Sequence, residues 1–247
     1  GGVKVAALTN GANLKGEMAD AFAEYGSWIR VSLDGYDDES YAKARRVGVG
    51  EFSKLLNNLA DFSARDTKCT LSAVYVVDHH NYNHVFDICE KLKVHGVKTV
   101  KLSGVIVGDS SDENSRYHQP IKDQVGKEIE QTKKLEDNDF LINDSYHDLD
   151  DRMWDKNYKT CPNLLYSPVI AADSKVYTCH DKAYTESGCL GDISNQSFKE
   201  FWYSQQNRKN IYEFSPSSQC KHHCVAHPRN ILMHEFLSLN RDHLDFT

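Results

Sequence analysis

Hydrophobic and polar positions follow two different periods along the first part of the chain. Continuous apolar runs typical of buried strands occur at 3–9, 28–33, 69–77 and 97–105. The first of them, VKVAALT, suits a strand that is covered on both faces. Between and after these runs the apolar residues recur at helical spacing, which predicts helices over 14–26, 37–46, 50–65, 82–96 and 120–136.

This order of elements predicts an α/β fold. Four strand–helix units in sequence imply parallel strands joined by right-handed crossovers. Four units are too few to close an eight-unit barrel, so we expect an open sheet or part of a barrel. In both architectures ligands gather at the carboxyl ends of the strands.

The pattern changes after the fourth unit. Residues 137–160 are polar and irregular, as expected of a connector. From Cys161 on the chain has short strand-like pieces and a turn at Asp173–Ser174, and then a helix predicted over 197–214. Ser197 and Glu200 fit a capping box at its start. We therefore expect a first domain at 1–136, a connector, and at 161–247 a small α+β domain that needs a metal centre to fold.

Composition and charge exclude several classes of protein. The chain has 247 residues, of which 40% are hydrophobic, so it can bury a core. Its net charge of -7 is spread without a basic stripe, so we expect neither general nucleic-acid binding nor membrane-surface binding. No apolar run approaches the roughly 20 residues of a membrane span. Seven cysteines without an export signal argue against a disulfide framework, and a cytoplasmic location is expected.

The cysteines fall into two groups. Cys69 lies on a predicted strand and Cys89 on the apolar face of a predicted helix, so both are expected to be buried core residues. The remaining five, which lie after residue 160, are Cys161, Cys179, Cys189, Cys220 and Cys224.

Four of these later cysteines suit a metal centre. Cys161 and Cys179 flank a predicted hairpin, and Cys220 and Cys224 form a short-range pair. Four thiolates in this arrangement suit tetrahedral zinc or a [4Fe–4S] cluster, and the spacing does not choose between them. His222 and His223, and the segment DHHNYNH at 78–84, contain metal-binding residue types, but we expect ordinary exposed side chains there.

The whole chain resembles the C-terminal two-thirds of a radical S-adenosylmethionine enzyme with a SPASM or twitch auxiliary-cluster domain. In the first domain the resemblance rests on ALTNG (7–11), WIRVSLDG (28–35), YAKARRVGVGEF (41–52) and VDHHN (77–81). In the second it rests on PVIAADSKVYTC (168–179) and CLGDISNQSFKEFW (189–202). Ser174 stands where the family usually has glycine. The resemblance implies the C-terminal part of a six-unit partial TIM-like barrel.

The resemblance also implies roles for residues of the first domain. Thr9 and Asn10 would lie near the ribose or methionine part of S-adenosylmethionine. Ser32 would form a hydrogen bond to this cofactor, and Asp34 would shape the turn. Arg45 would bind its carboxylate, for which a guanidinium is well suited. The adjacent Arg46 is an equal candidate, and an exposed helix arginine is the alternative for either.

In the second domain the resemblance assigns Cys161, Cys179, Cys220 and Cys224 to one auxiliary [4Fe–4S] cluster. Cys189 is the fifth candidate ligand, with a packing role as its alternative. No cysteine follows Cys224, so one auxiliary cluster is the maximum. Zinc is the alternative metal.

Enzymes of this family also need a second [4Fe–4S] cluster, held by a Cys-x3-Cys-x2-Cys loop, which cleaves S-adenosylmethionine to a 5′-deoxyadenosyl radical. The sequence contains no such loop. We expect that it precedes Gly1 in the natural protein, and that the chain as given does not catalyse the radical reaction.

The resulting function hypothesis is a radical S-adenosylmethionine oxidoreductase or maturase that abstracts hydrogen from its substrate. The substrate would be a peptide or a small molecule such as an alcohol or sugar, and an electron donor protein would be a partner. One alternative is a non-catalytic module of the same descent that binds a peptide or carrier protein. The other is a zinc-stabilised α/β protein without a redox role.

Overall fold

The computed structural model describes residues 3–108, 110–147 and 153–239. Residues 148–152 of the predicted connector and the last eight residues of the predicted second domain lie outside the described residues. The contacts divide the chain into two compact units, the first formed by Gly1–Ile106 and Ser115–Asp150 and the second by Val107–Asn114 and Asp151–Thr247. Among the described residues, no helix has the length and apolar character needed to cross a bilayer.

The first unit is built on a parallel sheet, as the sequence predicts. Its strands lie side by side in chain order, and each pairs in parallel with the next. They are β1 (Val5–Thr9), β2 (Gly26–Leu33), β3 (Thr70–Val77), β4 (Thr99–Gly104) and β5 (Leu141–Asp144). The strand β5 is a correction, because the sequence pattern predicts only irregular chain there. This strand is only four residues long and half of its residues are polar, so the hydrophobic pattern does not identify it.

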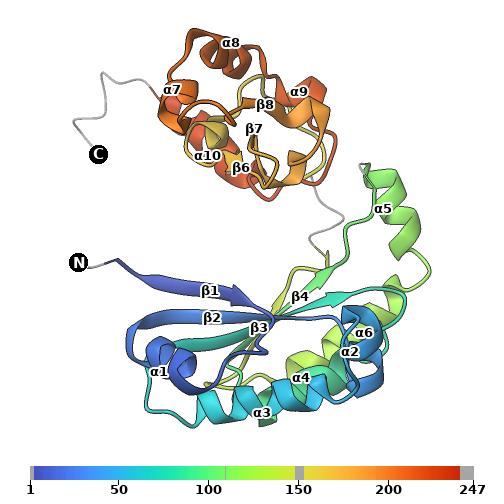
Figure 1. Cartoon of the computed structure of the whole chain (residues 1–247). Coiled ribbons are helices and arrows are strands. Elements are labelled where there is room, and N and C mark those ends of the chain that lie inside the picture. Colours follow the sequence, from blue (N-terminus) through green and yellow to red (C-terminus); the bar gives the residue numbers. More distant parts are fainter. Residues whose placement is uncertain (1–2, 109, 148–152, 240–247) are drawn as a thin grey trace. The chain divides into compact units, whose positions relative to one another are not determined.

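Helices cover one face of this sheet (Figure 1). They are α1 (Gly16–Tyr25), α2 (Asp38–Arg45), α3 (Glu51–Ser63), α4 (Val85–Val94) and α6 (Lys122–Thr132). The predicted helix over 120–136 is α6 followed by a 3₁₀ turn, Lys133–Leu135. The helix α5 (Ser111–His118) is polar throughout, and the sequence pattern does not predict it.

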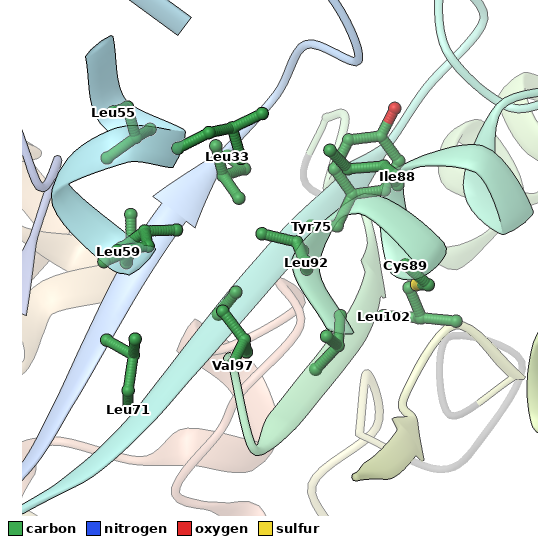
Figure 2. Close-up of a cluster of buried hydrophobic side chains, with 14 of the residues drawn as sticks. Leu33, Leu55, Leu59, Leu71, Tyr75, Ile88, Cys89, Leu92, Val97 and Leu102 are labelled. Carbon is green, nitrogen blue, oxygen red and sulfur yellow. The ribbon is translucent and has the colours of Figure 1, made fainter. Parts of the chain in front are cut away.

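The core of the first unit lies between the sheet and these helices. Along β2, residues Ile29, Val31 and Leu33 are fully buried, whereas the intervening Arg30 and Ser32 are only partly buried. Figure 2 shows how leucines of α3 and α4 pack on the buried side chains of β2, β3 and β4. The prediction for Cys69 and Cys89 is confirmed, because both belong to this core. Burial raises the pKa of the Cys89 thiol to about 12, which keeps it protonated.

The strand β1 differs from its prediction. It forms the edge of the described sheet, where only β2 pairs with it, and Val5 and Leu8 are 47% and 73% exposed. The expectation that this run is covered on both faces is therefore wrong for this structure. An apolar run does not by itself distinguish an edge strand from a central one, because both can carry the same residues.

The second unit contains a small antiparallel sheet of β6 (Val169–Ile170), β7 (Lys175–Tyr177) and β8 (Cys189–Asp192). The predicted hairpin between Cys161 and Cys179 is confirmed as β6–β7. Ser174 in its turn has a φ of 60°, the left-handed conformation that glycine adopts most easily. Two short helices, α9 (Pro216–Gln219) and α10 (His227–Ser238), flank the Cys220–Cys224 loop.

The predicted helix over 197–214 is two helices, α7 (Phe198–Trp202) and α8 (Gln205–Glu213). The capping box of Ser197 and Glu200 is present at the start of α7. The break follows because the Ser204 side chain accepts a hydrogen bond from the Asn207 N–H and starts a new helix. The small core of this unit includes Leu164, Val176, Leu190 and Phe201.

Candidate functional site

Three of the predicted cofactor residues form one hydrogen-bonded group in the first unit. Nη2 of Arg45, at the end of α2, donates to the Ser32 hydroxyl at 2.9 Å and to the Ser32 carbonyl at 3.0 Å. Nε of the same guanidinium forms an ion pair with the Asp34 carboxylate. Arg46 is exposed and has a φ of 55° beyond the helix end. Of the two candidate arginines, only Arg45 thus reaches the end of β2.

The turn after β2 is held by a buried asparagine. The Asn81 amide, from the segment after β3, donates to the Asp34 carbonyl at 3.0 Å and to the Val76 carbonyl at 2.8 Å. Burial raises the pKa of Asp34, the Arg45 guanidinium opposes that shift, and Asp78 adds to it. The carboxyl ends of β2 and β3 are therefore linked at the position where a parallel sheet binds its ligands.

Thr9 and Asn10 lie at the same edge of the sheet. Thr9 is paired with Val31, the neighbour of Ser32 on β2. The Thr9 hydroxyl accepts a hydrogen bond from the Gly11 N–H, and the Asn10 side chain accepts one from the Ala12 N–H, both at 3.1 Å. These side chains shape the turn after β1. No described hydrogen bond links them to Ser32, Asp34 or Arg45.

A cleft of about 600 Å³ opens beside Asp34, between α2 and the segments that follow β3 and β4. Its charged lining is mainly acidic, although Lys43 also belongs to it. The carboxylates are those of Asp34, Asp37, Glu39 and Asp78. The cleft therefore favours positively charged ligand groups.

In the second unit, four of the five candidate cysteines line one small cavity. They are Cys161, Cys179, Cys220 and Cys224. The folded chain brings them together because Cys161 precedes the β6–β7 hairpin and Cys179 follows it, while the loop between α9 and α10 carries the other two. Cys189 is exposed on β8 and does not line the cavity.

Burial raises the pKa of three of these thiols. It raises the pKa of Cys220 to about 12, with the Lys182 ammonium group opposing the shift and the other cavity thiols adding to it. The pKa values of Cys179 and Cys224 are also raised by burial. Four thiols that line one cavity match a centre whose metal charge stabilises the thiolates.

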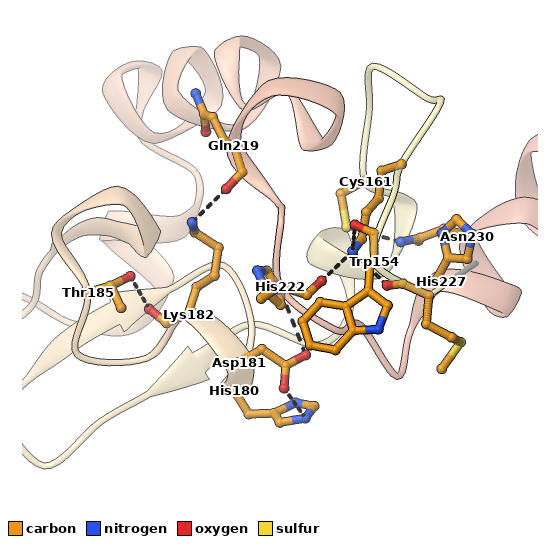
Figure 3. A network of polar contacts seen from close by, with 12 residues as sticks. Trp154, Cys161, His180, Asp181, Lys182, Thr185, Gln219, His222, His227 and Asn230 are labelled. Carbon is orange, nitrogen blue, oxygen red and sulfur yellow. Dashed lines mark hydrogen bonds and ion pairs between the residues drawn. The ribbon is translucent and has the colours of Figure 1, made fainter. Parts of the chain in front are cut away.

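Asn230, a polar residue of α10, completes the cavity wall. The Asn230 amide donates to the Cys161 sulfur at 3.4 Å and to the Tyr158 hydroxyl at 3.2 Å, and its oxygen accepts from the Asn163 N–H. Asn230 is 1% exposed. Figure 3 shows Asn230 beside Cys161. A hydrogen bond to a ligand sulfur is one of the means by which proteins adjust iron–sulfur centres.

An acid and a histidine stand beside Cys179. One possible ligand atom from each of Cys179, Asp181 and His222 lies within 4.8 Å of the other two. Among the described residues, no other group of three or more potential ligand residues meets this limit. No three of the four cavity sulfurs therefore lie within 4.8 Å of one another. Asp181 also lies 3.1 Å from His180, and the His222 side chain is only 11% exposed. The expectation that His222 is an exposed side chain is wrong, because its loop folds inward between two cavity cysteines.

Two of the three histidines of DHHNYNH contact other residues of the first unit. His79 lies 2.6 Å from the Tyr117 carbonyl. His84 stacks on Tyr36 and contacts Asp87 at 3.1 Å. In the described part of the chain, this segment contributes to no group of potential metal ligands.

The sequence pattern also misses several residues of the two sites. Asn81, Asp181 and Asn230 are single polar residues without a periodic signal. Asp181 could be suspected from its position two residues after Cys179, and Asn81 from the resemblance of VDHHN. Nothing in the local sequence distinguishes Asn230 from other helix asparagines.

Comparisons with known proteins agree with this division into two sites. Residues 1–92 match the Radical SAM superfamily, and residues 161–225 match SPASM, an iron–sulfur cluster-binding domain. No curated protein sequence is significantly similar to the chain.

Solved structures share the fold at low sequence identity. Native anSMEcpe with bound AdoMet has a TM-score of 0.50 and 17% identity, over 84% of this chain and 58% of that one. The same protein with AdoMet and Cp18Cys peptide has a TM-score of 0.50 and 15% identity, over 90% and 63%. SuiB from Streptococcus suis has a TM-score of 0.52 and 10% identity, over 86% and 51%. The chain thus spans between half and two-thirds of the length of these proteins.

Proposed function

We propose that the chain acts as a radical S-adenosylmethionine oxidoreductase or maturase. The proposal is supported by the match of residues 1–92 to the Radical SAM superfamily and of residues 161–225 to the SPASM iron–sulfur cluster-binding domain. In this proposal Cys161, Cys179, Cys220 and Cys224 hold one auxiliary [4Fe–4S] cluster. A cluster of this kind supplies one-electron chemistry when it is bound.

The observation that carries the proposal is the shared cavity of the four cysteines. The spacing of their sulfurs supports a cluster over a single ion. Tetrahedral zinc with bonds of about 2.3 Å holds its sulfurs about 3.8 Å apart. No three of these four sulfurs, all in described residues, come within 4.8 Å of one another. The wider spacing favours a larger inorganic group.

In the first unit we assign S-adenosylmethionine to the carboxyl ends of β1 and β2. Arg45 would bind the cofactor's carboxylate, since its contacts with Ser32 and Asp34 do not use Nη1. The Ser32 hydroxyl would add a hydrogen bond, while Asp34 fixes the guanidinium. Thr9 and Asn10 would shape the adjacent turn.

We further propose a peptide substrate. A structure with a similar fold, anSMEcpe, was solved with the Cp18Cys peptide bound. The acidic lining of the cleft beside Asp34 would favour peptide segments that carry lysine or arginine.

Anaerobic purification tests the cluster. We expect a broad absorbance near about 400 nm from charge transfer between thiolate and iron, together with bound iron and sulfide. The double variant Cys161→Ser/Cys179→Ser should lose both, whereas Cys189→Ser, a matched control outside the cavity, should keep them. A colourless wild-type protein with stoichiometric zinc would refute the proposal.

One observation favours zinc as the second candidate. Cys179, Asp181 and His222 offer the mixed sulfur, oxygen and nitrogen donors that zinc accepts, at mutually close distances. Asp181→Asn separates the two candidates. It should weaken a zinc site of this kind but leave a cluster held by four cysteines in place.

A further inference from the structure

Two lysine side chains of the second unit are buried next to the cysteine cavity. Lys156 is 5% exposed and Lys182 is 6% exposed. Lysine is almost never buried to this degree unless its charge has a partner. Their position therefore requires an explanation.

The Lys156 ammonium group lines the cavity itself. It donates to the carbonyl oxygens of Met153 at 2.7 Å and Trp154 at 2.6 Å, and to that of His222. All three donors of the ammonium group are thereby used on neutral backbone acceptors. The contact with His222 links the chain before Cys161 to the loop that carries Cys220 and Cys224.

The Lys182 ammonium group contacts the residue that precedes Cys220. It donates to the Gln219 carbonyl at 2.9 Å and to the Ser187 hydroxyl at 2.8 Å. Figure 3 shows Lys182 reaching Gln219, with its own carbonyl bound by the Thr185 hydroxyl. Gly188 packs so closely that a β-carbon there would lie 2.2 Å from the Lys182 carbonyl oxygen. The Lys182 backbone is therefore fixed in place.

Together the two lysines hold the loop on both sides of Cys220. Lys182 binds the residue before Cys220, and Lys156 binds His222 between Cys220 and Cys224. Both side chains thus bring a positive charge to the loop and fix its backbone.

In the described part of the chain, no carboxylate is paired directly with either ammonium group. Among the described residues, neither ammonium group has a carboxylate oxygen within 4.0 Å, and the nearby Asp181 contacts His180 and His222 instead. Burying a charge without an opposite charge is strongly unfavourable. In a metal-bound centre the four cysteines that line this cavity are thiolates. Lys156 lines the same cavity, and Lys182 binds the residue next to Cys220.

We propose that Lys156 and Lys182 are the buried counter-ions of the cysteine centre, an inference that rests on the proposed function. A [4Fe–4S] cluster with four thiolates is a dianion when oxidised and a trianion when reduced. Two fixed ammonium groups match the charge of the oxidised form and stabilise the reduced form further. The lysines thereby raise the reduction potential of the cluster, and they act as positioning residues for the loop that carries two of its ligands.

The test is the reduction potential of the auxiliary cluster in Lys156→Met and Lys182→Met, measured by redox titration with electron paramagnetic resonance. Methionine keeps much of the side-chain volume but removes the charge. We expect the equilibrium for reduction to become at least tenfold less favourable in each variant, or about 59 mV more negative for one electron. Lys221→Met is the matched control, because Lys221 lies in the same loop but is exposed. Its potential should not change.

Further variants keep the test decisive. Met variants with wild-type iron content and wild-type potential would overturn the proposal. If a Met variant binds no iron, the corresponding arginine variant is tested, because arginine keeps the positive charge. Iron in the arginine variant supports the proposal, and its absence there too overturns it.

A zinc-loaded wild-type protein would refute the proposed function without settling this inference. Zinc that is retained in Asp181→Asn is held by the cysteines, and a centre with four thiolates on zinc is also a dianion. The Met variants should then lose zinc to a chelator more readily than wild type and Lys221→Met. Unchanged zinc affinity would overturn the counter-ion role.

Discussion

Arg45 and Ser32 are joined by two hydrogen bonds from a single nitrogen. Nη2 of Arg45 contacts both the hydroxyl and the carbonyl oxygen of Ser32, at 2.9 and 3.0 Å. This contact fixes the end of α2 against the end of β2, 13 residues away in sequence. It also places a permanent positive charge at the edge of the sheet where parallel strands present their ligand sites.

We predict that Arg45→Ala weakens the binding of S-adenosylmethionine by about tenfold or more, since hydrogen bonds to charged groups contribute about 1.5–3 kcal/mol. Equilibrium dialysis with the anaerobically prepared protein measures this. Arg46→Ala, which alters the exposed neighbouring arginine, is the control and should bind as wild type does. Equal loss in both variants would contradict the assignment of Arg45.

Gly35 should resist substitution because of a close backbone approach. A β-carbon at Gly35 would lie 2.5 Å from the Tyr41 nitrogen and Cα atoms in α2. Gly35→Ala must therefore displace α2, and with it Arg45. We expect a loss of about 1–3 kcal/mol in the free energy of unfolding and weaker S-adenosylmethionine binding.

The control is Gly126→Ala, because Gly126 lies within α6 and a β-carbon there meets nothing within 4 Å. Alanine should stabilise that helix by about 1 kcal/mol. Denaturant unfolding compares the two variants, and a neutral Gly35→Ala would be inconsistent with the described contact.

Tyr75 offers a stabilising substitution. Its side chain is fully buried among the core residues shown in Figure 2, and its hydroxyl has no hydrogen-bond partner in the described structure. Tyr75→Phe removes this unsatisfied group, so the free energy of unfolding should rise by about 1 kcal/mol or more. Tyr146→Phe is the comparison, because the buried Tyr146 hydroxyl lies 3.1 Å from His118 Nδ1. That variant should be destabilised, and denaturant unfolding that ranks the two in the opposite order would count against the prediction.

The capping box of α7 predicts a dependence of stability on pH. The Ser197 N–H and hydroxyl both donate to the Glu200 carboxylate, and these hydrogen bonds lower the pKa of Glu200 from 4.5. Because the folded-state pKa lies below the unfolded one, this contribution is present above pH 4.5 and is lost as the pH falls through the folded-state value.

Thermal unfolding of wild type and Glu200→Gln checks this dependence. The wild-type advantage in melting temperature should be present at neutral pH and should shrink in acid. An advantage that grows with acidity would show that the carboxylate form is not the stabilising one.

Local sequence was sufficient for much of the fold. Runs of apolar residues at the right period identify β2, β3 and β4 and the helices that cover them, because those elements bury one face each. Ser197 and Glu200 were identified as a cap because a capping box is a local motif. Where the local signal is weak or absent, as in β5 and α5, the sequence pattern predicted neither element.

The residues of the candidate sites were likewise predictable from the sequence only in part. The predicted hairpin and the short spacing of the last pair indicated that four cysteines form one metal site. The same four cysteines line the cavity. The inward position of His222 and the burial of Lys156 and Lys182 could not be predicted. Each depends on contacts between residues far apart in sequence, such as the 66 residues between Lys156 and His222.

By itself, the sequence determined the order of the elements, the parallel sheet and the set of cysteines, because hydrophobic period and residue type are local properties. Only the tertiary structure decided that Cys189 lies outside the cavity, that Arg45 rather than Arg46 reaches Ser32, and that two lysine charges are buried beside the thiols. These outcomes depend on which surfaces the folded chain covers, because burial and distance arise only when segments from different parts of the sequence pack together.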